Sequence, residues 1–169
     1  MVAATPALRQ LIAMRSEDAA LLRDLLALPR VAALGVLVEG APYVGLVPFA
    51  VAADRQALLV HASRLARHTR GLLAGAPFSA LMHAPDAPDA DPLQLPRVTF
   101  LGAVAPLVPG SDDEAAARDR YLARFPGAEQ TFALPDFALY ALRIREGRLV
   151  AGFARARDVS PADLAALGG

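Results

Sequence analysis

Three segments rich in β-branched and other apolar residues follow one another with only short turns between them. Val31 to Val38 and Tyr43 to Ala52 are separated by Glu39-Gly40-Ala41-Pro42, and Ala53-Asp54-Arg55-Gln56 then leads into Ala57 to His61. Connections this short join antiparallel strands, because a parallel crossover needs a dozen or more residues. The chain is therefore predicted to form an antiparallel meander rather than alternating βαβ units.

Further strands are expected at Phe78 to His83 and at Arg97 to Val108. Asp136 to Arg145 and Arg148 to Ala156 are predicted to pair as a hairpin across Glu146-Gly147. Six or seven strands closed by hairpins, with few charges to protect their edges, indicate a small antiparallel barrel.

Helices are expected on the flanks of this barrel. Thr5-Pro6 predicts the start of an opening helix that ends before Pro29. The capping box Ser111-Asp112-Asp113-Glu114 predicts a helix as far as about Phe125, and Ser160-Pro161 predicts a short last one. Ala62 to Leu73 also has helical spacing. The predicted fold class is therefore mainly β with flanking helices (α+β).

The 169 residues fit a single domain. Residues 1–29 are expected to form an N-terminal helix, residues 30–156 the barrel, and residues 157–169 a short C-terminal helix. The proline-rich stretch Ala84 to Pro96 is typical of a surface loop. Hydrophobic residues make up 55% of the chain, which is ample material for one core.

Composition excludes several function classes. Seventeen basic residues balance seventeen acidic ones, which argues against nucleic-acid or membrane-surface binding by bulk charge. The sequence has no cysteine and no lysine, so thiol catalysis, thiolate metal sites and Schiff-base chemistry are excluded. The apolar run Val31 to Val38 is far shorter than a membrane span, and the charged N-terminal segment is unlike a signal peptide. We therefore expect a cytoplasmic protein.

The stretch from His61 to Arg70 carries the strongest chemical signal. It holds three arginines, two histidines, a serine and a threonine within ten residues, and the sequence has no acidic residue between His61 and Pro85. On a helix starting at Ser63, one arc would present the polar residues Ser63, Arg64, Arg67, His68 and Arg70. Forked guanidinium donors suit a phosphate ester, so an anion site is predicted. An ordinary solvated arginine face remains the alternative.

Other chemistries are weaker. His61, His68 and His83 lack nearby acidic or thiolate ligands, so a metal site is disfavoured. Ser63 could be imagined beside a histidine and Asp136, but no nucleophile elbow surrounds it. His61 is equally well explained as a hydrogen-bonded histidine at the end of a strand.

Pro48 lies inside one predicted strand. A proline cannot donate to the hydrogen-bond ladder, so Gly45 to Ala50 is expected at an edge or a bulge. Freed backbone groups at a bulge are places where a flat ligand can meet main-chain donors and acceptors.

From about Pro29 to Ala156 the chain resembles the pyridoxamine 5′-phosphate oxidase-related family, closest to its HugZ-like haem-utilisation branch. The matching segments occur in the family's order: Gly45 to Ala50, Leu59 to Arg70, Arg97 to Gly102, Tyr121 to Pro126, Asp136 to Tyr140 and Val150 to Ala156. The resemblance implies an FMN-binding split β-barrel that forms a homodimer, with the flavin in a cleft between the subunits.

The resemblance also implies which residues hold the cofactor. The expected phosphate contacts are Ser63, Arg64, Arg67, His68 and Thr69. His61 and the strand segment Val47, Pro48 and Phe49 are expected along the ribityl chain and the ring. The family often has a lysine in the phosphate segment, where this chain has His68 or Thr69.

We therefore expect a flavin-dependent oxidoreductase with an unknown small-molecule substrate, in which the flavin supplies the redox chemistry. No residue is a persuasive general acid or base. A haem-binding or haem-degrading protein is the second expectation, ranked lower because haem-degrading relatives use a histidine near the C-terminus and this chain has none after His83. The third is a non-enzymatic flavin carrier or sensor.

Overall fold

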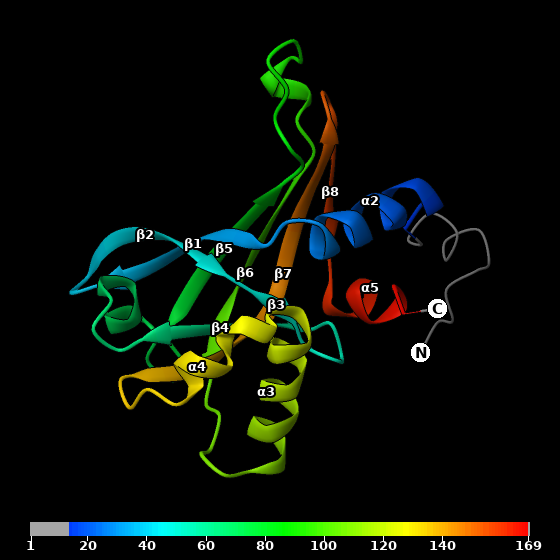
Figure 1. Cartoon of the computed structure of the whole chain (residues 1–169). Helices are drawn as coiled ribbons and strands as arrows, with labels where there is room; N and C mark the ends of the chain where they lie inside the picture. Colours follow the sequence, from blue (N-terminus) through cyan, green and yellow to red (C-terminus); the bar gives the residue numbers. More distant parts are fainter. Residues whose placement is uncertain (1–13, 169) are drawn as a thin grey trace, which may run out of the picture.

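The structure is a computed structural model that describes residues 14–168, so the predicted helix start at Thr5-Pro6 lies outside the described residues. One antiparallel sheet has the strand order β2-β1-β5-β6-β7-β4-β3, with β8 paired to β7 (Figure 1). Its strands are β1 (Val31–Val38), β2 (Ala41–Pro48), β3 (Ala50–Val51), β4 (Ala57–Ser63), β5 (Pro77–His83), β6 (Arg97–Ala105), β7 (Phe137–Gly152) and β8 (Arg155–Val159). The predicted mainly β chain with flanking helices is confirmed.

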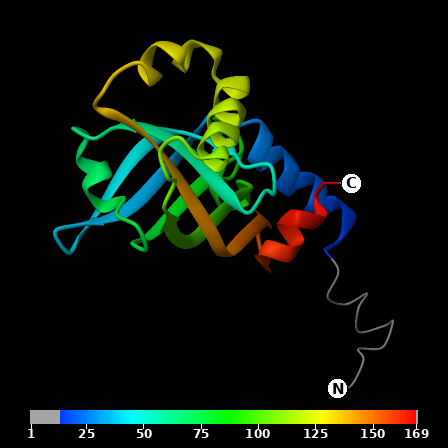
Figure 2. The same ribbon diagram turned by 90° about the horizontal axis from the view of Figure 1, so that it is seen from below.

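The helices lie at the ends and sides of the curled sheet (Figure 2). They are α2 (Ser16–Ala27), α3 (Asp112–Arg124), α4 (Glu129–Phe132) and α5 (Pro161–Ala166), with short 3-10 helices η1 (Arg67–Gly71), η2 (Pro92–Gln94) and η3 (Pro126–Ala128). Helix α2 packs against β5, β6 and β7, and α3 packs against β3, β4 and β7. No helix within residues 14–168 is long and apolar enough to cross a membrane.

A corner at Phe49 brings the two edges of the sheet together. Strand β2 pairs with β1 as far as Pro48, and the chain then continues into β3, which pairs with β4 through Ala50 and Leu59. The backbone N–H of Phe49 donates to the Arg30 carbonyl at 3.3 Å. The chain thus passes from one edge of the sheet to the other and curls it into a half-barrel. The prediction that Pro48 marks an edge or a bulge is confirmed.

The core fills the concave side of the half-barrel. Helix α2 contributes Leu22, Leu25 and Leu26, which pack with buried residues from most of the strands. Phe49 and Phe100 are its largest fully buried side chains. Alternation along β1, where Leu34 and Val36 are buried while their neighbours are more exposed, follows the period of two expected for a sheet with one buried face.

The hairpin predicted across Glu146-Gly147 is wrong. Strand β7 is continuous, and the turn occurs at Phe153-Ala154, where Ala154 has a φ of 56°. Gly147 lies opposite Phe100 inside the sheet, and a Cβ there would stand 2.7 Å from the Phe100 ring. The glycine therefore makes room for a buried aromatic side chain rather than for a turn.

The helix predicted over Ala62 to Leu73 is also wrong. Strand β4 runs on to Ser63, and only η1 is helical within that range. The backbone N–H of Arg64 donates to the Asp136 carbonyl at 2.6 Å, which prolongs the pairing of β4 with β7. Ser63 itself is extended and paired with Phe137 of β7, so a helix does not begin there.

Candidate functional site

The segment between β4 and η1 is fixed by the residues just before β7. The Ser63 hydroxyl donates to the Asp136 carboxylate at 2.6 Å and accepts from the Leu65 N–H at 3.1 Å. Thr69 is buried, and its hydroxyl donates to the carbonyls of Ala66 at 2.6 Å and Arg64 at 3.2 Å. Both hydroxyls are therefore engaged within the chain, where they shape the loop that carries the arginines.

Three arginines of this loop point into solvent. Arg70 lies 3.8 Å from Glu39, whereas neither Arg64 nor Arg67 forms an ion pair with any residue in the described range 14–168. The Arg67 guanidinium lies over the Tyr43 ring at 5.1 Å, a cation–π contact that orients the side chain. We call Arg64 and Arg67 the arginine pair. It is a patch of unneutralised positive charge.

His68 lies beneath this patch rather than in it. Its ring packs on Gly45, where an added Cβ would stand 3.1 Å from the ring Nδ1. The Nε2 atom is buried without a hydrogen-bond partner, and burial lowers the pKa of His68. A neutral imidazole follows at pH 7, so positive charge at this place comes from the arginines.

The side chains of Val47, Pro48 and Phe49, expected along the flavin, alternate between the two faces of the chain. The side chains of Val47 and Phe49 are buried in the core, whereas Pro48 is exposed and lines a cavity with His61. Through their side chains, Val47 and Phe49 therefore contact the protein interior, and Pro48 alone of the three faces the cavity.

His61 is surrounded by aromatic rings on one side of a cavity of about 620 Å³. Its ring stacks on Phe132 at 3.8 Å and lies 5.1 Å from the Phe137 ring. The Nδ1 atom is 3.3 Å from the Thr131 hydroxyl, and Nε2 is buried without a partner. The cavity is lined by Arg30, Val31, Pro48, His61, Tyr121, Phe125, Pro126, Gly127, Ala128, Thr131 and Phe137.

Strand β4 links the cavity of His61 to the loop of the arginine pair. His61 and Ser63 are two residues apart, so their side chains face the same side and are about 7 Å apart along the strand. Asp136 and Phe137, which contact Ser63 and His61 respectively, continue this connection. The loop that carries the arginine pair therefore begins at the end of the strand that carries His61.

Because His61 and His68 are buried, the stability of the folded protein depends on pH. Burial, and for His61 also the charge of Arg118, lowers the pKa of His61 and of His68 below the ordinary value of 6.5. The unfolded chain then binds more protons than the folded one just below that value, so stability falls as pH decreases from 6.5.

We expect the unfolding free energy, measured by urea denaturation, to be lower at pH 5.5 than at pH 7.5. The double variant His61→Gln/His68→Asn should show a flatter pH dependence, whereas His83→Asn, at an exposed position, should keep the wild-type slope. An unchanged slope in the double variant would contradict this explanation.

Comparison with solved structures identifies related proteins. A heme binding protein from Mycobacterium smegmatis is 30% identical with a TM-score of 0.77, and the alignment covers 91% of this chain and 62% of that one. A second solved structure is 31% identical with a TM-score of 0.71, over 90% of this chain and 97% of its own. No protein-family model and no curated protein matches the sequence.

More distant structures share the fold. HutZ from Vibrio cholerae, a heme storage protein, is 22% identical with a TM-score of 0.67, over 78% of this chain and 92% of its own. A member of the pyridoxinephosphate oxidase family from Clostridium acetobutylicum is 8% identical with a TM-score of 0.63, over 89% of this chain and 99% of its own. The chain shares the split β-barrel fold of the pyridoxamine 5′-phosphate oxidase-related proteins, as the resemblance predicted. Its neighbours include proteins of the HugZ-like branch.

In this split-barrel protein, several neighbours of the site come from segments that the sequence did not point to. Tyr43 supports Arg67, and the short helix α4 brings Phe132 and Thr131 onto His61. Asp136, a conceivable partner of Ser63 from the sequence, is in contact with its side chain in the structure. The aromatic residues after Pro126-Gly127 were the one sequence feature that could have pointed to the surroundings of His61, since aromatic rings pack readily beside a buried histidine.

Proposed function

We propose that the protein binds FMN, with the phosphate on the arginine pair and the flavin ring beside the cavity of His61. The observation that carries this proposal is that the loop with two unpaired arginines follows directly on the strand that carries His61 and its aromatic cavity. FMN has the matching shape, with a dianionic phosphate at one end of a short polar chain and a flat aromatic ring at the other.

Of the groups in the site, the arginine pair is the one best suited to bind a phosphate. Arginine presents parallel N–H donors that match phosphate oxygens, and such charge-assisted hydrogen bonds are about twice as strong as neutral ones. The hydroxyls of Ser63 and Thr69 already donate within the chain, so we give them the role of holding the loop in place. The phosphate would be bound mainly by Arg64 and Arg67.

A bound flavin would supply hydride and electron transfer, and we propose that the protein is an oxidoreductase of unknown substrate. The residues of this chain bind and orient the ring. Rings such as Phe137 and Tyr121 keep its surroundings apolar. A carrier or sensor would bind FMN equally well, and the two are separated by whether the flavin-loaded protein oxidises a reduced nicotinamide.

We also propose that the protein is a homodimer. The convex face of the sheet carries exposed apolar side chains in adjacent rows: Val44 and Leu46 of β2 are 66% and 70% exposed, and Leu101 of β6 is 42% exposed. In the strand register, one row across the sheet runs from Val44 through Gly35 and Ser79 to Leu101. The next row runs from Leu46 to Ala33 and Leu81. Several large exposed apolar side chains on one face of a sheet are typical of an interaction surface.

A charge placed in this patch should separate the subunits. We expect Leu46→Arg to halve the molar mass measured by light scattering, because an unpaired buried charge is strongly unfavourable in an interface. Leu93→Arg, at a 63% exposed position in η2, is the matched control and should leave the mass unchanged. A wild-type protein that is already a monomer would contradict the proposed dimer.

Haem is the second candidate ligand. The neighbour that is 30% identical is a heme binding protein, and a neighbour 21% identical binds FAD and heme. In this chain burial lowers the pKa of His61. The Thr131 hydroxyl donates to the Ala128 carbonyl and so accepts from the Nδ1–H of His61, which leaves the lone pair on Nε2 beside the aromatic cavity. A neutral imidazole nitrogen is the usual protein ligand of haem iron.

The absorbance spectrum of the purified protein tests the proposal and separates the two candidates. We expect flavin bands in the freshly purified protein, or their appearance at one equivalent after FMN is added and free FMN removed. A Soret band that moves in the variant His61→Ala would instead support haem. Protein that retains neither ligand after incubation with each would reject both.

A further inference from the structure

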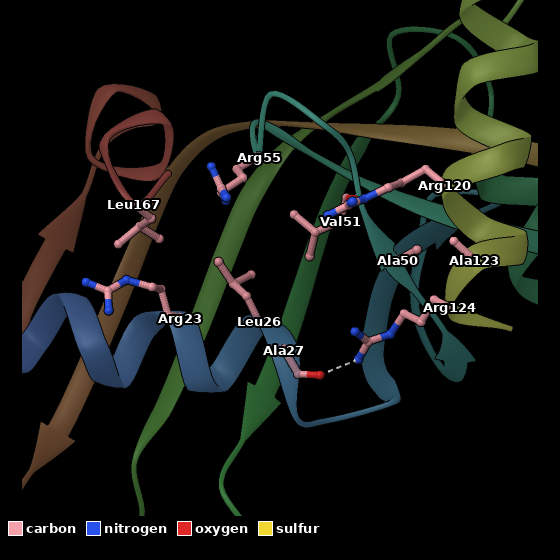
Figure 3. Close-up of a pocket in the computed structure, with 10 residues that line it drawn as sticks. All are labelled: Arg23, Leu26, Ala27, Ala50, Val51, Arg55, Arg120, Ala123, Arg124 and Leu167. Carbon is pink, nitrogen blue, oxygen red and sulfur yellow. Dashed lines mark hydrogen bonds between the residues drawn. The ribbon is translucent and has the colours of Figure 1, made fainter. Parts of the chain in front are cut away.

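A second cavity, of about 460 Å³, is lined by a separate set of residues (Figure 3). Helices α2 and α3, strand β3 and the C-terminal end of α5 enclose it. Its apolar lining comes from Leu26, Ala27, Ala50, Val51, Ala123 and Leu167. It shares no lining residue with the cavity of His61, and its volume is within the range of small-molecule sites.

Four arginines complete the lining, and no acidic residue does. Arg120 and Arg124 come from α3, Arg23 from α2, and Arg55 from the turn before β4, as Figure 3 shows. None of the four pairs with a carboxylate in the part of the chain that the structure describes. Four positive charges around one small cavity repel one another unless an anion lies between them.

Arg124 shows this repulsion most clearly. Its guanidinium donates to the carbonyls of Ala27 at 2.9 Å and Pro29 at 2.5 Å, while its Nε–H is buried without a partner. Burial, together with the charges of Arg30 and Arg120, lowers the pKa of Arg124. A buried charged group with an unpartnered donor is costly, and an anion in the cavity would offset the positive charge of this side chain.

We propose that this cavity binds a small organic anion, independently of the flavin site. Its carboxylate or phosphate group would lie by Arg120 and Arg124, and its apolar body would cover Leu26 and Val51 between the two pairs of arginines. In Figure 3 the side chains of Leu26 and Val51 lie between the α3 arginines on one side and Arg23 and Arg55 on the other. A charged rim with an apolar floor selects ligands that have both an anionic and an apolar part.

Phenyl phosphate is a suitable probe, with benzyl alcohol as its uncharged analogue. Calorimetric titrations would use protein with Arg64→Gln/Arg67→Gln, so that the proposed flavin site does not contribute. We expect phenyl phosphate to bind and benzyl alcohol not to bind. Adding Arg120→Gln should weaken the binding of phenyl phosphate about tenfold, since one charge-assisted hydrogen bond contributes about 1.4 kcal/mol.

Two further variants keep the result interpretable. Arg145→Gln removes the same charge from the exposed side of β7 and should leave binding unchanged. Because Arg120 also donates to the Val51 carbonyl at 2.9 Å, Arg23→Gln is a second test that removes no hydrogen bond within the described chain. Benzoate as a further probe distinguishes carboxylate from phosphate ligands. Equal affinity in the Arg23, Arg120 and Arg145 variants, or no binding of either anion, would overturn the proposal.

Discussion

Replacing Phe49 with alanine is expected to lower the unfolding free energy by about 3–5 kcal/mol, measured by urea denaturation. Phe49 is fully buried at the corner where the chain passes from β2 to β3, and the Arg124 guanidinium lies 5.3 Å from its ring centroid. Removing the ring would leave a cavity at the point that brings the two edges of the sheet together. The effect should be global unfolding at lower denaturant.

The variant Phe49→Leu is the matched control, and a volume-conserving change of this kind should cost less than about 1.5 kcal/mol. The pair of variants also separates two roles for this residue, because the family resemblance placed Phe49 along the flavin. A Phe49→Ala protein of normal stability with weakened flavin binding would show that the ring contacts the ligand instead of the core.

The double variant Arg64→Gln/Arg67→Gln is expected to bind FMN about a hundredfold more weakly, measured by fluorescence titration. Each guanidinium is expected to contribute one charge-assisted hydrogen bond worth about 1.5 kcal/mol, and two such losses correspond to roughly a hundredfold in affinity. Because both side chains are exposed, neither takes part in an ion pair within residues 14–168, and only the cation–π contact of Arg67 with Tyr43 is lost, stability should fall by no more than about 1 kcal/mol.

Arg143→Gln/Arg145→Gln removes the same total charge from strand β7 and is the comparison for this variant. It should bind FMN like the wild type, since neither side chain belongs to the arginine pair or lines the cavity of His61. A similar loss in both double variants would mean that net charge, and not the arginine pair, determines the affinity.

Much of the sheet could be predicted because its signals are local. The turn at Glu39-Gly40 and the alternation of Val31 to Val38 depend on neighbouring residues, and β1 has the predicted bounds. Pro48 marked the end of the second strand because a proline has no N–H to donate to the sheet, whatever its tertiary surroundings. The capping box at Ser111 likewise identified α3, and Ser111 accepts from the Glu114 N–H at 3.2 Å.

The remaining features depend on partners far away in the sequence. Gly147 looks like a turn residue until Phe100 is placed against it, and the loop after β4 is set by Asp136, which is 73 residues from Ser63. The local sequence pattern carries no information about either contact, so it predicted a turn at Gly147 and a helix from Ala62 that do not form. The same reason hid the second cavity, because its four arginines come from three separate segments of the chain.

The affinity of the wild-type protein for FMN compared with that for riboflavin tests the central claim most directly. The two ligands share the ring and ribityl chain, and only FMN carries the phosphate. Binding of the phosphate by Arg64 and Arg67 predicts that FMN binds about a hundredfold more tightly than riboflavin. Equal affinities would contradict the account, because they would show that nothing in the protein recognises the phosphate.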